Sequence, residues 1–180
     1  MAEEQPPEVK ADARQFMSDL MSAPPPDDEF TGGAGADMTA WRATFAASSR
    51  KDAALMEQFW SYYDPSSTSL WKMVYDEANS NENLNDTVDL VSDFIKNAES
   101  LRDHCFGVIH ILEGLEIEGL WFFNGPDPQQ LFGANEDTSW YTWTQVGPDA
   151  NELVKKAVVD VLAPANGKIN GKAIKDTLTF

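Results

Sequence analysis

The chain is poor in cysteine and in basic residues, and both shortages narrow the classes of protein to which it can belong. Its 180 residues include one cysteine, Cys105, so no disulfide can form within the chain, which fits a reducing compartment. Thirteen lysines and arginines stand against thirty aspartates and glutamates, a formal net charge of −17. Nucleic-acid phosphates and anionic lipids both repel such a charge. We therefore expect neither DNA nor a membrane as a partner, and we do not favour RNA.

Long hydrophobic runs are also missing. No segment approaches the roughly 18 apolar residues of a membrane span. The acidic start, residues 1–7, has neither the apolar region of a signal peptide nor the arginines of a mitochondrial presequence. The expected location is therefore cytoplasmic.

Proline and glycine are concentrated near the beginning of the chain. Five of the ten prolines and the glycine-rich run at 31–36 precede residue 50. Such a segment cannot bury enough apolar surface to offset the entropy lost on ordering. Residues 1–50 are therefore predicted to form an extended acidic arm, and residues 51–180 to form the folded domain.

One part of the predicted arm favours a short amphipathic helix, near residues 11–22. Its apolar side chains recur at helical spacing and would form one stripe. About three turns of helix are marginal alone, so the stripe is expected to fold back onto the domain or to dock a partner, unless the segment stays disordered. The candidate partner-binding residues of this stripe are Phe16, Met17, Leu20 and Met21.

From residue 51 onward the apolar periodicity is that of an α+β domain. Helical spacing predicts helices over 55–63, 86–101 and 149–162, the last two capped by Asp86 and Asp149. Alternating apolar residues predict strands over 69–75, 104–112, 117–123, 129–132 and 139–145. The later strands are joined by short turns, so they should pair antiparallel. The predicted fold is an antiparallel sheet of about five strands flanked by α-helices, with no element assigned to residues 173–180.

Residues suited to metal binding or nucleophilic catalysis are few. His104 and His110 lie six residues apart on one predicted strand, and at ~3.3 Å per residue they are about 20 Å apart, too far for one ion to bridge. Cys105 is next to His104 but should face the opposite side of the strand, as a buried and inert thiol. We therefore expect no metal, no cofactor and no enzymatic activity.

Three carboxylates cluster on one predicted hairpin turn, and they provide the alternative hypothesis of an enzyme. They are Glu113, Glu116 and Glu118. Acid–base catalysis requires a carboxyl group held in an apolar pocket with a raised pKa. A hairpin tip is solvated, so an acidic surface is favoured over a catalytic site.

Two tryptophans near the end of the predicted sheet are candidate partner-binding residues. Trp140 and Trp143 are three residues apart on one predicted strand, so they should face opposite sides. One is expected to belong to the core and the other to lie near the surface. Exposed aromatic side chains on a sheet often mark contact with a covering element or a partner.

Several aromatic motifs occur in an order that resembles a known family. They are Phe59-Trp60, Asp64, Ser69-Leu70-Trp71, Leu101-Arg102, Phe106, Gly119-Leu120-Trp121-Phe122-Phe123, Gly125 and Tyr141-Thr142-Trp143. Through these motifs, residues 38–180 resemble the conserved C-terminal domain of translation elongation factor 1 gamma. The resemblance implies an α+β domain without established catalytic residues. The protein that carries this domain in the family is the scaffold subunit of the elongation factor 1 nucleotide-exchange complex, so the resemblance implies a link to that complex.

The resemblance sets the expected function. The family's scaffold normally carries an N-terminal glutathione-transferase-like domain, and here only the predicted arm, residues 1–50, precedes the predicted domain, so a stand-alone domain is expected. The expected function is a non-catalytic protein-binding or scaffold module associated with the elongation factor 1 complex. The alternative is a structural subunit of another large assembly, cytoskeletal or organellar, that docks through its N-terminal arm. The expected partners are proteins in either case.

Overall fold

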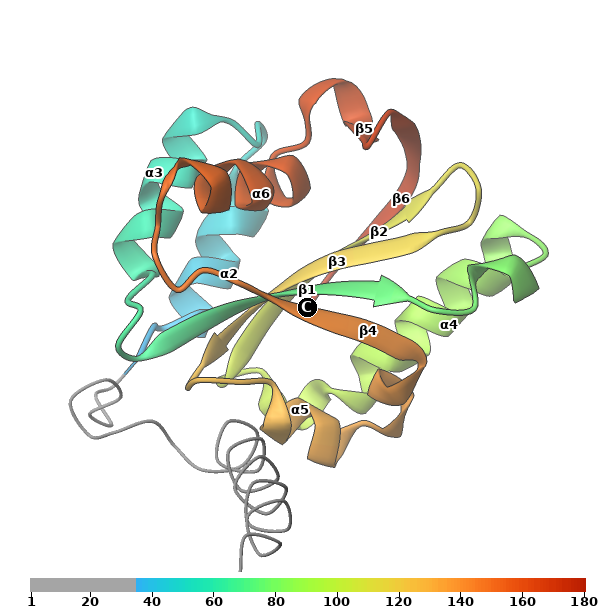
Figure 1. Ribbon diagram of the computed structural model, residues 1–180, viewed down its shortest axis with the longest axis horizontal. Helices are drawn as coiled ribbons and strands as arrows, with labels where there is room; N and C mark the ends of the chain where they lie inside the picture. The colour runs from blue at the N-terminus through green and yellow to red at the C-terminus, as the bar shows by residue number, and fades with distance from the viewer. Residues whose placement is uncertain (1–34) are drawn as a thin grey trace, which may run out of the picture.

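The computed structural model describes residues 35–180, which form a curled six-stranded antiparallel sheet and five α-helices (Figure 1). The strands are β1 (Thr68–Tyr75), β2 (Cys105–Leu112), β3 (Ile117–Asn124), β4 (Tyr141–Val146), β5 (Lys168–Ile169) and β6 (Lys172–Thr179). Their order across the sheet is β4-β1-β3-β2-β6-β5. The helices are α2 (Met38–Ala47), α3 (Ala53–Tyr62), α4 (Leu84–Asn97), α5 (Gln129–Ala134) and α6 (Glu152–Leu162). The α+β fold with an antiparallel sheet, as predicted, is confirmed.

The helices cover both faces of the sheet and give the domain two apolar clusters. Helices α2, α3 and α6 pack on one face, and α4 and α5 lie on the other (Figure 1). Strand β2 shows the alternation on which this depends, because Phe106 and Val108 join the first cluster while Cys105 and Ile109 join the second. The prediction that Cys105 faces away from His110 on this strand is therefore correct. Within residues 35–180, none of the helices has the length and apolarity that a membrane crossing requires.

Helix α2 corrects the predicted boundary at residue 50. Met38, Trp41 and Phe45 recur at i, i+3 and i+7 and are buried in the first cluster. The Asp37 side chain accepts a hydrogen bond from the backbone N–H of Ala40 at 2.9 Å and caps the helix. The folded unit therefore includes residues 35–50, which belong to the predicted arm.

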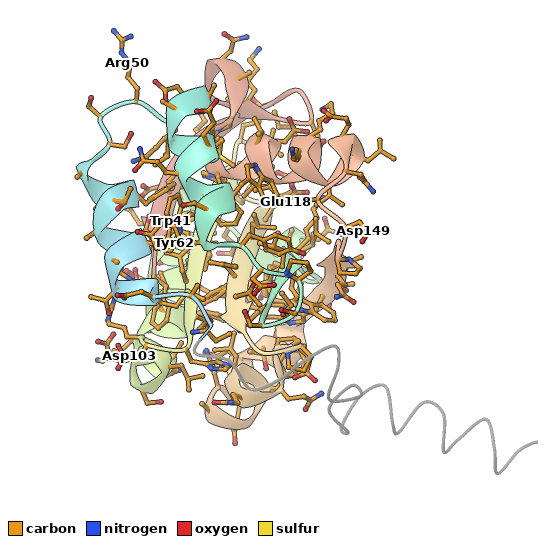
Figure 2. The ribbon with its side chains drawn as sticks, turned by 90° about the vertical axis from the view of Figure 1, so that its left-hand side faces the viewer. Trp41, Arg50, Tyr62, Asp103, Glu118 and Asp149 are labelled. Carbon is orange, nitrogen blue, oxygen red and sulfur yellow. The ribbon has the colours of Figure 1, made fainter. Side chains whose placement is uncertain are left out.

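Aromatic side chains join α2 to its neighbours. The Trp41 ring lies 5.6 Å from the ring of Tyr62 on α3, and the two side chains lie together in Figure 2. It also lies 5.1 Å from Phe59 and 5.7 Å from Phe106 on β2, both at edge-to-face angles. Such tilted arrangements are favourable for aromatic pairs. Trp41 therefore connects two helices and the sheet.

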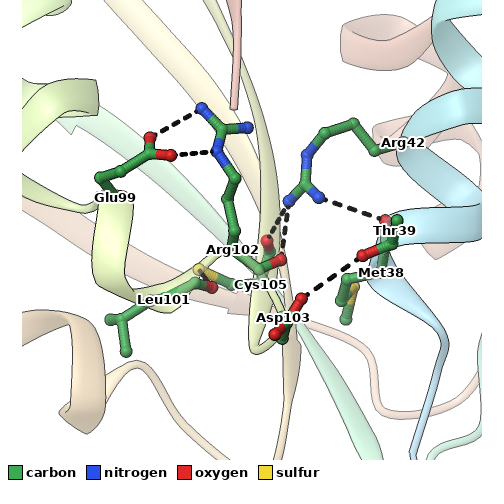
Figure 3. A network of polar contacts seen from close by, with 8 residues as sticks. All are labelled: Met38, Thr39, Arg42, Glu99, Leu101, Arg102, Asp103 and Cys105. Carbon is green, nitrogen blue, oxygen red and sulfur yellow. Dashed lines mark hydrogen bonds and ion pairs between the residues drawn. The ribbon is translucent and has the colours of Figure 1, made fainter.

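A polar network anchors α2 to the segment that leads into β2 (Figure 3). Arg42 donates from Nη2 to the backbone carbonyls of Arg102 at 3.0 Å and Cys105 at 2.8 Å. The two guanidinium groups lie over the ring of Phe180, at 5.5 Å for Arg42 and 4.8 Å for Arg102. Both carbonyl groups thus accept a hydrogen bond from a charged donor, and Phe180 is held between α2 and the segment that leads into β2.

Two predicted elements differ in the structure. Residues 129–132 form the start of helix α5 instead of a strand, because Asp127 accepts a hydrogen bond from the backbone N–H of Gln129 at 3.0 Å and starts a helical turn after Pro128. Residues 172–179, to which no element was assigned, form β6, which pairs with β2 from Val108 to Leu112. Residues 168–169 add a further short strand, β5, so the sheet has six strands, one more than predicted.

Two helices begin at a different cap from the one predicted. Asn83, not Asp86, caps α4 and accepts a hydrogen bond from the backbone N–H of Asp86 at 2.8 Å. Asn151, not Asp149, caps α6 and accepts from Val154 at 3.0 Å. In both cases an asparagine side chain accepts from a free N–H group of the first turn.

A buried histidine connects β2 with α6. His110 is 3% exposed, and its Nε2 donates to the backbone carbonyl of Val161 at 2.6 Å. Its Nδ1 lies 2.8 Å from the hydroxyl of Thr177, which donates to it in the neutral imidazole. Burial lowers the pKa of His110 below its ordinary value.

This histidine makes stability depend on pH. The unfolded chain takes up a proton near pH 6.5, whereas the folded chain resists protonation to lower pH. Stability present above pH 6.5 is therefore expected to fall as the pH decreases below it. Chemical unfolding between about pH 7.5 and 5.5 should show a shallower decline for His110→Gln than for the natural chain. His104→Gln is the matched comparison, because burial also lowers the pKa of His104. An unchanged decline in His110→Gln would contradict the prediction.

Candidate functional site

A groove of about 790 Å³ opens where α4 passes the paired ends of β1 and β4. Residues from β1, α4, β4 and two 3-10 turns, η2 (Ala78–Ser80) and η4 (Glu136–Trp140), form its walls. The lining residues are Tyr75, Glu77, Ser80, Asp86, Asp89, Leu90, Asp93, Asp137, Trp140 and Tyr141. The groove therefore brings together segments that are distant in the sequence.

The groove is strongly acidic. Asp86, Asp89 and Asp93 recur at i, i+3 and i+7, so they project from one face of α4. Glu77 and Asp137 add two carboxylates from the two turns. Among residues 35–180, no lysine or arginine lines this groove, and none of these carboxylates forms an ion pair. The groove therefore presents a field of a single sign.

The acidic side chains are spread along the groove and do not meet at one point. In the part of the chain that the structure describes, no group of three or more histidine, cysteine, aspartate or glutamate side chains could hold a metal ion. A single cation needs several ligands at bonding distance. The arrangement suits a partner whose positive charges are also spread along its length.

Trp140 forms the exposed aromatic side of the groove. Its side chain is 55% exposed. The turn that carries it is fixed from three directions. The Asn135 amide donates to the carbonyl of Phe94 at 2.9 Å, the Trp143 indole N–H donates to the carbonyl of Thr138 at 3.1 Å, and the backbone N–H of Asp76 donates to the carbonyl of Trp140 at 3.0 Å. The exposed indole is thus displayed from a well-anchored backbone.

Tyr141 forms the floor of the groove. It is 6% exposed and packs against the rings of Tyr75, at 5.1 Å, and Phe94, at 5.0 Å. Burial, followed by the charges of Tyr75 and Asp137, raises the pKa of its hydroxyl. Tyr75, Asp137 and Tyr141 all line the groove. The hydroxyl has no hydrogen-bond partner among the described residues, which is costly for a buried polar group.

A second hollow, of about 510 Å³, lies beside the same turn and shares Tyr141. Trp143 lines it and packs on Phe132 at 5.3 Å, at an edge-to-face angle. Trp143 is half-buried against the second apolar cluster, whereas Trp140 is exposed. The predicted difference in burial between the two tryptophans is therefore correct. However, Trp140 ends η4 and does not belong to a strand.

The partner-binding role of the predicted residues stays a prediction. The structure brings Trp140 and Trp143 to the two hollows that flank η4. The apolar stripe of the predicted arm helix, formed by Phe16, Met17, Leu20 and Met21, lies outside the described residues.

The acidic hairpin of the enzyme hypothesis is only partly exposed. Glu113 is exposed, whereas Glu116 and Glu118 are half-buried. Glu116 pairs with Lys172, and this hydrogen bond lowers the pKa of the carboxyl group. A general acid requires a shift in the opposite direction. The geometry therefore favours an ion pair between the hairpin and β6 over a catalytic carboxyl group.

The single thiol lies in an environment that suppresses nucleophilicity. Cys105 is fully buried, and burial raises the pKa of its thiol to about 12. Its Sγ donates to the backbone carbonyl of Leu101 at 3.6 Å. A reactive cysteine needs a lowered pKa and access to solvent. Cys105 therefore acts as a core side chain.

The fold and the groove define this protein as an antiparallel α+β domain with an acidic, aromatic groove. Comparison with known families identifies the family. The profile described as elongation factor 1 gamma, conserved domain, matches residues 27–127, more than half of the 180-residue chain. The chain belongs to the elongation factor 1 gamma conserved-domain family, as its aromatic motifs indicated. No curated protein matches the sequence.

The family match covers one part of the groove and not the other. It includes β1, which supplies Tyr75, and α4, which supplies the row of aspartates. It ends at residue 127, before the turn that carries Asp137 and Trp140. The groove thus combines a matched helix face with an aromatic turn from the segment beyond the match.

Proposed function

We propose that this chain is a non-catalytic protein-binding module that works with the elongation factor 1 complex in the cytoplasm. The family match over residues 27–127 is the observation that carries this proposal. The groove supports it, because an exposed tryptophan anchored on a rigid turn is typical of a contact surface for another protein.

The side chains that could carry chemistry support a non-catalytic role. The Cys105 thiol is buried with a raised pKa, and the Glu116 carboxylate forms an ion pair with Lys172. His110 is occupied on both ring nitrogens by hydrogen bonds within the fold. Each of these groups therefore serves the core or the surface of the domain, and none combines access with an activated state.

Reconstitution with purified components tests the proposal. The full chain is mixed with the elongation factor 1 GTPase and with its exchange subunit, separately and together, and analysed by size-exclusion chromatography. Co-elution with either protein is expected. The absence of co-elution at micromolar concentrations would contradict the association with this complex.

A parallel purification from cells tests the alternative assembly. Recovery of cytoskeletal or organellar subunits in place of elongation factor subunits would support the alternative and overturn the proposal. The same experiment with residues 1–34 deleted tests docking through the arm. If deletion leaves every partner bound, the arm is not the docking element.

A further inference from the structure

The acidic groove has the charge and shape to select one kind of partner. We propose that it binds a lysine- and arginine-rich segment of a protein, with one basic side chain placed over Trp140. This inference rests on the proposed function as a protein-binding module, and it identifies the chemistry of the partner at one site.

Charge is the first argument. Five carboxylates among the described residues line the groove, and no described lysine or arginine offsets them. A row of aspartates along α4 matches a chain segment with repeated cationic groups, because each added charge meets another carboxylate. The same carboxylates do not converge in a set that could hold a metal ion within residues 35–180. A basic peptide therefore fits the groove better than a single cation.

Trp140 supplies the second argument. Its indole is 55% exposed and lies beside the acidic row, in the same groove. Lysine and arginine carry both an apolar stem and a charged end, so they can pack on an indole face while their charge meets a carboxylate. Apolar ligands would gain only the first contact, and simple cations only the second.

The floor of the groove gives a third, independent argument. The Tyr141 hydroxyl is nearly inaccessible, belongs to a side chain that lines the groove, and lacks a partner among the described residues. A peptide backbone carbonyl in the groove would accept a hydrogen bond from it after a small displacement of the lining side chains. Such a contact would remove an unfavourable feature of the free protein.

Other occupants are disfavoured by charge. The N-terminal segment, residues 1–34, has eight acidic and two basic residues, so it would be repelled from the groove. A second copy of the chain has a formal net charge of −17. Nucleic acids carry a phosphate for every nucleotide. A basic segment from a different protein is the occupant that the field attracts.

Fluorescence anisotropy with a fluorescein-labelled oligo-arginine peptide tests the inference on the full chain. The double variant Asp89→Asn/Asp93→Asn is expected to bind this peptide about tenfold more weakly. The matched control is Glu57→Gln/Asp149→Asn, which removes the same charge from exposed positions elsewhere. Equal weakening by both variants would show attraction by net charge alone and would overturn the groove as the binding site.

The aromatic contact is tested in the same assay. Trp140→Ala is expected to weaken binding about threefold, whereas Leu153→Ala, which removes an apolar side chain that is 80% exposed, should leave the affinity unchanged. Tyr141→Phe is expected to weaken binding about threefold through loss of the hydroxyl. Natural affinity in Trp140→Ala would overturn the placement of a basic side chain on the indole. Thermal unfolding of each variant confirms that it is folded.

The outcome can be separated from the outcome for the proposed function. If elongation factor 1 subunits co-elute with the chain but oligo-arginine does not bind, the groove inference fails and the proposed function stands. If oligo-arginine binds in the groove but no elongation factor subunit co-elutes, the groove inference stands without that complex. Subunit binding that is unaffected by Asp89→Asn/Asp93→Asn would show that the complex uses a different surface.

Discussion

Replacing Trp41 with alanine is expected to reduce the free energy of unfolding by about 3–5 kcal/mol. The side chain is completely buried and contacts aromatic rings on α2, α3 and β2. Its removal leaves a cavity that three elements would have to fill together. Denaturant unfolding followed by circular dichroism measures the loss.

Trp41→Phe is the matched control for this variant. The indole Nε1 of Trp41 is buried and has no hydrogen-bond partner among the described residues. Phenylalanine removes this unsatisfied donor and keeps an aromatic ring, so a much smaller loss is expected. A small loss in Trp41→Ala as well would mean that α2 contributes little to the domain. The predicted boundary at residue 50 would then describe the stable unit better.

Gly107→Ala is expected to lower the free energy of unfolding by about 1–3 kcal/mol through overpacking. A Cβ at residue 107 would lie 2.6 Å from Cδ2 of the Trp121 indole, which is on the neighbouring strand β3. The indole has no room to retreat, because it is completely buried and its ring lies 5.7 Å from Phe94 and 5.5 Å from Phe180. Thermal unfolding of the purified variant measures the effect.

Gly133→Ala is the matched control for the glycine variant. A Cβ at residue 133 meets no atom within 4 Å, and the residue lies in helix α5. Alanine is favoured over glycine in a helix by roughly 0.5–1 kcal/mol, so this variant should be slightly more stable. Equal stability of Gly107→Ala and the natural chain would show that the indole can shift at no cost.

The strands with clear apolar alternation were predictable from sequence. β1, β2 and β3 lie within one residue of their predicted bounds at both ends, because each has alternating or continuous apolar residues and a clear turn at its ends. β6 could not be found in this way. Its sequence is locally polar at Lys175, Asp176 and Thr177, and the strand is stabilised by hydrogen bonds to β2, which lies far earlier in the sequence. Propensity does not contain such long-range pairing.

Helix α2 was missed for a different reason. Its signal was present, since Asp37 can cap a helix and Met38, Trp41 and Phe45 have helical spacing. The average composition of residues 1–50 is dominated by prolines and glycines, so it does not reveal these few helical positions. Composition describes a segment as a whole, whereas a helix of ten residues depends on a few positions.

The candidate site was only partly visible in the sequence. Trp140 and Trp143 were identified, and the spacing of Asp86, Asp89 and Asp93 could have indicated an acidic helix face. Their meeting in one groove depends on the pairing of Tyr75 with Tyr141, which places η4 beside α4. That neighbourhood follows from the strand order, and strand order is decided by the packing of the entire domain.

The strand order also has a consequence for synthesis on the ribosome. Strand β2 lies between β3 and β6, yet β6 leaves the exit tunnel after every other strand of this sheet. Until then the nascent chain exposes an edge of β2, a strand that is buried along its full length in the finished domain. An exposed apolar edge invites pairing with other chains. The interval between translation of β2 and release of β6 is therefore when a chaperone would protect this protein most.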